Sequence, residues 1–178
     1  QLTLDEMPEL DLYMDQVTTF MDAQLSASKR YESDKILTKT MINNYAKNDL
    51  LPPPTKKKYS KEHLLLLVFI YYFKNLLTIT DIQALLKPIT DKYFQDSDSL
   101  TLEDIYNEVF RLEKSQIDVL KEDISNRYHL SRETFSDAPE EDQEFLKTFS
   151  FICLLSFDVY VKKQIIEKLI DQMNPPQK

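Results

Sequence analysis

The chain has 178 residues, a formal net charge of −8 and no glycine. Walker-type loops and dinucleotide-binding fingerprints need glycine so that the backbone can approach a phosphate, and the composition therefore excludes both kinds of nucleotide site. A content of 42% apolar residues suffices for one sizeable core, and the single cysteine excludes an internal disulfide framework.

The lack of glycine also bears on the fold class. Tight hairpins with primed turns favour glycine, so such hairpins are disfavoured here. Asn, Asp and Pro are available to end helices instead. We therefore expect an all-α, or nearly all-α, protein.

The first two predicted helices lie within residues 10–50. An acidic amphipathic helix is expected over residues 10–25, and a polar loop over residues 26–35 follows it. Thr38 can then cap a second short helix. In that second helix the apolar residues fall on one face at helical spacing: Met41, Ile42, Tyr45 and Ala46. Core packing is the favoured role for Tyr45.

The other face of the second helix carries only hydrogen-bonding and cationic side chains: Lys39, Thr40, Asn43, Asn44 and Lys47. Asn can bridge N6 and N7 of adenine, and Lys can reach guanine or a phosphate. This face is suited to a recognition helix in the DNA major groove. A solvated helix face without a partner is the alternative interpretation.

A proline-stiffened basic loop follows this helix. Pro52, Pro53 and Pro54 precede a basic tract that ends in an aromatic residue: Lys56, Lys57, Lys58 and Tyr59. Between residues 38 and 63 there are six Lys against two acids, a local balance of +4 in an acidic chain. Such a reversal of charge is expected where phosphates are neutralised.

A helix containing Asn-Tyr is followed by Leu-Leu-Pro-Pro, a basic loop ending in Tyr and another helix. This order of elements resembles the winged helix-turn-helix of MerR-type transcription regulators. The chain resembles more closely an uncharacterised bacterial family with the same DNA-binding-like core. The resemblance covers roughly residues 10–90 and implies that the second helix reads bases while Lys57 and Tyr59 belong to the wing. Three features depart from the MerR pattern: Asn43 replaces an Arg, Asp49 replaces the helix-ending Gly, and the wing lacks glycine.

The rest of the chain is predicted to be helical. A strongly apolar central helix is expected over residues 64–77, a short helix starting with the capping box Thr80 to Gln83, and a boundary within residues 88–100. A long helix should then run from residue 102 to about His129, and a second from Pro139 to Met173. Residues 91–150 hold seven basic and sixteen acidic residues, so this part should repel nucleic acid.

Catalysis and membrane insertion are not expected. Neither His63 nor His129 has a His or Cys at the spacing of a metal site, and solvated histidines at helix ends are the expected interpretation. No cofactor site is predicted. The apolar run over residues 64–73 is half the length of about 20 residues that a membrane span needs. No secretory signal is seen, so we expect a cytoplasmic protein.

These observations predict two parts: a helix-turn-helix part over residues 1–90 and an acidic helical part over residues 91–178 that dimerises or senses something. The expected function is a transcription regulator that binds double-stranded DNA as a homodimer. The alternative is a non-catalytic protein-interaction module on a winged-helix scaffold. The sequence identifies no small-molecule effector.

Overall fold

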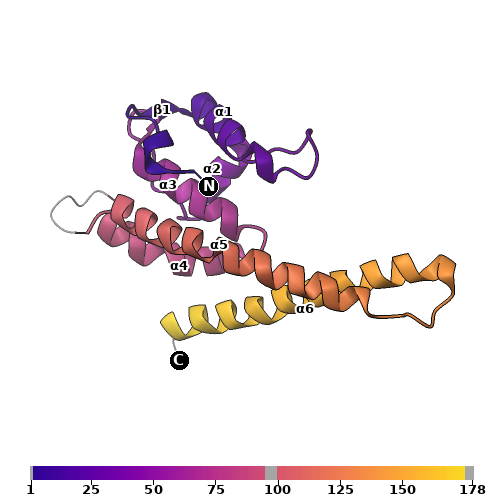
Figure 1. The fold of residues 1–178 in the computed structure, drawn as a ribbon. Helices are drawn as coiled ribbons and strands as arrows, with labels where there is room; N and C mark the ends of the chain where they lie inside the picture. Colours follow the sequence, from indigo (N-terminus) through magenta and orange to yellow (C-terminus); the bar gives the residue numbers. More distant parts are fainter. Residues whose placement is uncertain (1, 95–99, 175–178) are drawn as a thin grey trace. The chain divides into compact units, whose positions relative to one another are not determined.

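A computed structural model describes residues 2–94 and 100–174 of the chain. Six α-helices and one two-stranded sheet occur in this part of the chain, and the structure is 71% helical (Figure 1). The prediction of a mostly helical fold is confirmed.

The N-terminal elements are short. They are β1 (Leu12–Tyr13), α1 (Met14–Gln24), α2 (Lys39–Lys47) and β2 (Lys58–Tyr59), with 3-10 turns at Leu4–Glu6 and Ser26–Ser28. The two strands pair antiparallel, with Leu12 opposite Tyr59 and Tyr13 opposite Lys58. This pairing attaches the basic loop to the start of α1.

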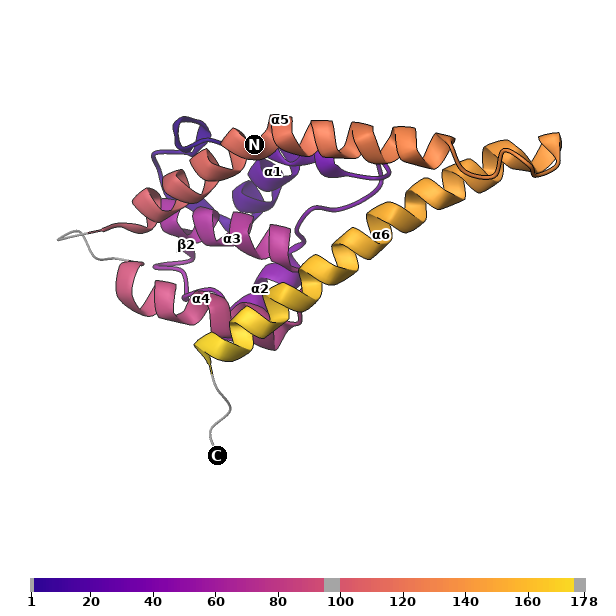
Figure 2. The same ribbon diagram turned by 60° about the horizontal axis from the view of Figure 1, so that its bottom comes forward.

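The core of the N-terminal part is built on α3 (Lys61–Phe73), which lies between α1 and α4 (Ile79–Tyr93) (Figures 1 and 2). Each residue from Leu64 to Ile70 is at most 7% exposed. Residues 64–70 are apolar on every side of the helix, as expected for a helix segment that is surrounded by neighbours.

The helix α4 starts two residues earlier than the predicted capping box would place it, because its N-cap is Thr78 and not Thr80. Thr78 Oγ accepts a hydrogen bond from the Asp81 N–H at 3.2 Å, and the Asp81 carboxylate accepts from the Thr78 N–H at 3.2 Å. The capping box is therefore formed by Thr78 and Asp81 and not by Thr80 and Gln83 as predicted. The helix also continues through Pro88, so the predicted boundary is partly helical, and its residues 95–99 lie outside the described residues.

The first compact unit ends at Phe110 and not at the predicted boundary after residue 90. The reason is that the first turns of α5 (Leu102–Arg132) pack in the core of this unit. Tyr106 is 1% exposed, its ring lies 5.6 Å from that of Phe69, and its hydroxyl donates a 2.7 Å hydrogen bond to the Leu2 carbonyl.

The second compact unit starts at Arg111 and contains the rest of α5 and all of α6 (Glu140–Met173). The two helices form an antiparallel hairpin. Arg132 binds Glu144 through two hydrogen bonds of 2.8 and 2.6 Å, and the rings of Tyr128 and Phe151 lie 5.5 Å apart. A single chain thus contributes a two-helix hairpin where a C-terminal helical bundle was predicted.

Among the helices of residues 2–94 and 100–174, none combines the length and the apolar character that a membrane crossing requires.

Candidate nucleic-acid interface

The helix α2 separates an apolar and a polar face as predicted. Thr38 Oγ caps the helix by accepting a 3.1 Å hydrogen bond from the Met41 N–H. Ile42 and Tyr45 are 0% and 6% exposed, so Tyr45 is a core residue. All five polar residues of the other face are exposed: Lys39, Thr40, Asn43, Asn44 and Lys47.

The C-terminus of α2 turns the chain back into the core. The Leu50 N–H donates to the Tyr45 carbonyl at 3.0 Å and the Asp49 N–H to the Ala46 carbonyl at 3.3 Å, which is a Schellman motif. Asp49 has a φ of 54° at the left-handed position that usually holds glycine. Leu50, at 1% exposure, then anchors the chain and leaves the polar face of α2 at the surface.

The basic loop forms a tight two-residue hairpin. Thr55 and Lys58 exchange backbone hydrogen bonds of 3.1 and 2.9 Å. Between them Lys56 and Lys57 have φ values of 50° and 65°. Positive φ at both central residues defines a type I′ turn, so the expectation that this glycine-free chain avoids primed turns is wrong at this position. Both lysines are exposed at the tip of this hairpin, residues 55–59, which we call the wing.

Tyr59 anchors the wing and does not contribute to its surface. It is 4% exposed, and its ring lies edge-on to His63 with centroids 5.4 Å apart. The resemblance implied that Tyr59 belongs to a DNA-binding wing, but the burial of its side chain is incompatible with a direct contact to DNA. Lys58 remains partly exposed, and its Nζ lies 5.2 Å from the centre of the Tyr13 ring.

His63 is 3% exposed, which corrects the expectation of a solvated histidine. It is the third residue of α3, so its Nδ1 can accept a 2.9 Å hydrogen bond from the Ser60 N–H in the manner of a capping-box Glu. Its Nε2 lies 3.2 Å from the Pro52 carbonyl oxygen, which fits a neutral ring that donates from Nε2. His63 thus links the proline segment to the wing. A Ser-x-x-His pattern at a helix start was the sequence signal for this role.

We expect the stability of the fold to decrease below pH 6.5 because of His63. Burial lowers the pKa of His63 from its ordinary value of 6.5. Below that pH the unfolded chain binds a proton that the folded chain does not, so the contribution is full above pH 6.5 and is lost as the pH falls. The slope can reach about 1.4 kcal/mol per pH unit for one proton.

Urea unfolding between pH 7.5 and 5 measures this effect. The variant His63→Gln keeps a side-chain acceptor at the third helical position but does not titrate in this range, and it should lose the slope. The exposed His129 provides the control, since His129→Gln should keep the pH dependence of stability that the parent shows. If stability depended on pH equally in the parent and in His63→Gln, the assignment of this pH dependence to His63 would be contradicted.

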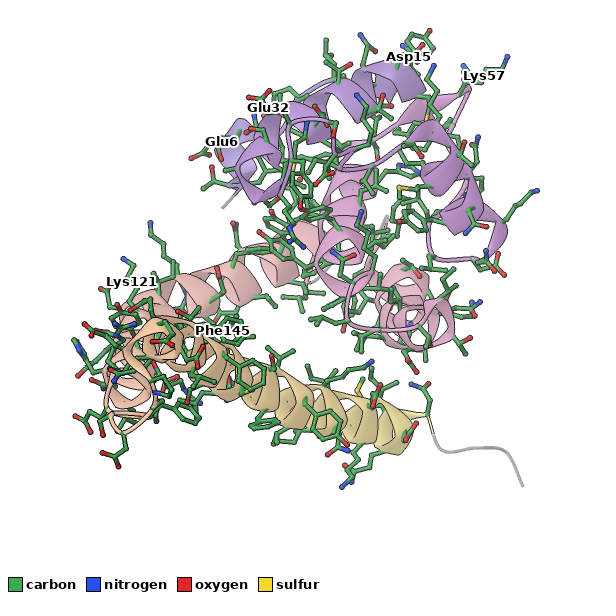
Figure 3. All side chains as sticks on the ribbon, turned by 90° about the vertical axis from the view of Figure 1, so that its right-hand side faces the viewer. Glu6, Asp15, Glu32, Lys57, Lys121 and Phe145 are labelled. Atoms are coloured by element: carbon green, nitrogen blue, oxygen red, sulfur yellow. The ribbon has the colours of Figure 1, made fainter. Side chains whose placement is uncertain are left out.

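The start of α1 connects the polar face of α2 with the wing. Asp15 forms an ion pair with Lys39 at the start of α2. Two residues before it, Tyr13 pairs with β2 and lies beneath Lys58. Figure 3 shows Asp15 and Lys57 at the same end of the first unit.

We call the resulting region the α2–wing surface; it consists of Lys39, Thr40, Asn43, Asn44, Lys47, Lys56, Lys57 and Lys58. It combines five cations with two side-chain amides and a hydroxyl. Such a surface can donate hydrogen bonds to phosphates and to base edges. Eight of the nine predicted residues are thus exposed or partly exposed, whereas the ninth, Tyr59, is buried and does not belong to this surface.

A family model matches residues 2–109, which is nearly the whole of the first compact unit. The hairpin that follows Phe110 lies outside the match. No curated protein and no solved structure matches the chain significantly. The match covers more than half of the chain, and the chain therefore belongs to the family described as a domain of unknown function, DUF1836.

Proposed function

We propose that this chain is a cytoplasmic transcription regulator that binds double-stranded DNA through a MerR-like winged helix-turn-helix. The observation that carries the proposal is the tip of the wing, where Lys56 and Lys57 both adopt left-handed backbone conformations. A type I′ turn favours Asn-Gly, and a non-glycine residue at positive φ costs roughly 1 kcal/mol. Lysine at both positions is explained by a need for positive charge at the tip, because such departures from local preference concentrate at functional sites.

The α2–wing surface suggests how the contacts would be divided. Asn43, Asn44 and Lys39 would approach base edges in the major groove from one helix face. Lys47, near the end of α2, would bind a phosphate, and the wing lysines would lie along the adjacent backbone.

One nine-residue helix offers few base contacts, so specificity would require two copies on half-sites about one helical turn apart. The functional unit proposed here is therefore a homodimer. No catalytic step is assigned to it.

Binding to a pool of randomised duplex DNA at two or more salt concentrations tests the proposal. The parent should enrich a sequence motif, and its affinity should fall steeply with salt. The triple variant Lys56→Ala, Lys57→Ala, Lys58→Ala should lower the slope of log affinity against log salt by about 2.7, since each lost phosphate contact removes about 0.9.

A matched control removes the same charge from the second unit. Arg111, Lys114 and Lys121 are exposed there, and replacing all three with Ala should leave the slope unchanged. If the parent enriches no motif at low salt, the regulator is ruled out for this chain. The alternative, a non-catalytic protein-interaction module on the same scaffold, would then be favoured.

The ion pair between Asp15 and Lys39 leads to a prediction of increased affinity. Both side chains are more than half exposed, so the pair contributes little to stability. Asp15→Asn would free Lys39 and remove a negative charge from the DNA-facing surface. We expect affinity to rise about tenfold at 0.1 M salt and the salt slope to steepen by about 0.9, because a freed lysine in the major groove would displace counterions from the nearby phosphates as a phosphate contact does. The exposed Glu32 lies elsewhere in the unit, and Glu32→Gln serves as the control in the same titration. An unchanged slope for Asp15→Asn would show that Lys39 does not contact DNA.

A further inference from the structure

The helix α6 carries an exposed apolar stripe, which we define as Phe145, Phe149, Ile152, Val159 and Tyr160. These side chains are 51% to 70% exposed. The first four follow one another at steps of four, three and seven residues, which places them on one face of the helix. Phe145, the first residue of the stripe, is labelled in Figure 3.

The second unit does not bury a core of its own. Of its described residues, 111–174, only Ser131 and Ile170 are buried. A helical hairpin is a single layer, and stable helical units bury their apolar faces between two layers. The α6 stripe therefore needs a covering surface.

Charges at the two sides of the stripe indicate which surface that is. Four acids precede it, Glu140, Glu141, Asp142 and Glu144, for a charge of −4. Three lysines and two acids follow it, Lys162, Lys163, Glu167, Lys168 and Asp171, for a charge of +1, and the two lysines nearest the stripe are adjacent. A second copy aligned parallel would place acids against acids. A second copy aligned antiparallel would place Glu141 and Asp142 of each copy against Lys162 and Lys163 of the other.

We propose that the α6 stripe binds the α6 stripe of a second copy in antiparallel orientation, so that two hairpins form a four-helix bundle. The twofold axis passes near Ile152. Asp142 lies ten residues before Ile152 (152 − 142) and Lys162 ten residues after it (162 − 152), so the symmetry brings these charges together. The interface is isologous, as in most homodimers.

The area of the stripe is compatible with this dimer. Five apolar side chains that are about half exposed present roughly 100 Å² each, or about 1,000 Å² in total from two copies. The flanking charged residues add to this area and bring it to the size of a stable interface, about 1,200 to 2,000 Å².

This inference deepens the proposed function, since it names the surface that would form the regulator's homodimer. Its test contains no DNA, so failure of the dimer and failure of DNA binding are distinguishable. Sedimentation equilibrium of the full chain measures the dimer directly, because a monomer has a mass of 21.1 kDa and a dimer twice that mass.

The test variant reverses two charges, Lys162→Glu and Lys163→Glu, which would face Glu141 and Asp142 of the second copy. We expect its dimer dissociation constant to rise at least tenfold. Adding Glu141→Lys and Asp142→Lys should restore the parent value. Residues 141 and 162 are separated by about 30 Å along one helix, so a rescue must arise between two copies.

The control is Lys114→Glu with Lys121→Glu on α5, which changes the net charge by the same amount. Lys121 also loses an intrahelical ion pair, to Asp118, as Lys162 does to Asp158, and the test variant additionally loses the exposed pair of Lys163 with Glu167. The control should dimerise like the parent. A monomeric parent at about 100 μM would overturn the proposal, and so would a quadruple variant that dimerises no better than the double variant.

Discussion

Replacing Lys56 with Asn and Lys57 with Gly should stabilise the fold and weaken DNA binding at the same time. Asn-Gly is the preferred pair for a type I′ turn, and it removes the unfavourable left-handed conformation of two lysines. We expect the free energy of unfolding to rise by about 1 to 2 kcal/mol. Urea unfolding with a circular dichroism signal measures this change.

The same double variant should lose about 100-fold in DNA affinity at 0.1 M salt, because each phosphate contact contributes about tenfold at that concentration. The control is Asp49→Gly, which relieves a left-handed residue at the end of α2 without removing a cation. This control should also stabilise the fold by about 1 kcal/mol but should not weaken binding. If the wing variant gains stability and keeps its affinity, the lysines at the tip do not bind phosphate.

Tyr106→Ala should destabilise the first unit by about 3 to 5 kcal/mol, the largest effect expected from a single substitution here. Tyr106 is 1% exposed and contacts the rings of Phe69 and Phe110 at 5.6 and 4.2 Å between centroids. Truncation to Ala would remove a large buried ring and leave a cavity. Because the hydroxyl also bonds the Leu2 carbonyl, Tyr106→Phe should cost about 1 to 2 kcal/mol.

Chemical unfolding of the full chain tests both substitutions at Tyr106. Tyr128→Ala provides a comparison on the same helix, because Tyr128 is 46% exposed and should cost much less. If Tyr106→Ala cost no more than Tyr128→Ala, the start of α5 would not belong to the core of the first unit.

Local patterns in the sequence predicted most of the helices. The apolar residues of α2 recur at helical spacing and Thr38 can cap it, so its bounds follow from its own residues. The boundary of the first unit did not follow in this way. The start of α5 belongs to this unit through contacts such as the hydrogen bond from Tyr106 to Leu2, which are 104 residues apart in the sequence. Hydrophobic periodicity carries no information about such a distant contact.

The residues of the candidate site were predictable where charge and exposure on a helix face or loop identify them. The polar face of α2 and the wing lysines were identified by residue type and spacing, and the structure leaves them accessible. The Ser-x-x-His pattern indicated the capping role of His63, but the burial of Tyr59 and His63 was not predictable, because contacts from several segments bury each of them. Phe94, whose ring lies 4.8 Å from that of His63, comes from the end of α4.

The left-handed residues at Asp49, Lys56, Lys57 and Phe135 have a consequence for the unfolded chain. A glycine at any of these positions would relax the native backbone but would also give the denatured chain more freedom to lose on folding. A chain without any glycine limits that freedom along its whole length. Its denatured ensemble therefore has less conformational entropy than that of an average chain of this length, and this difference offsets part of the local cost at the four positions.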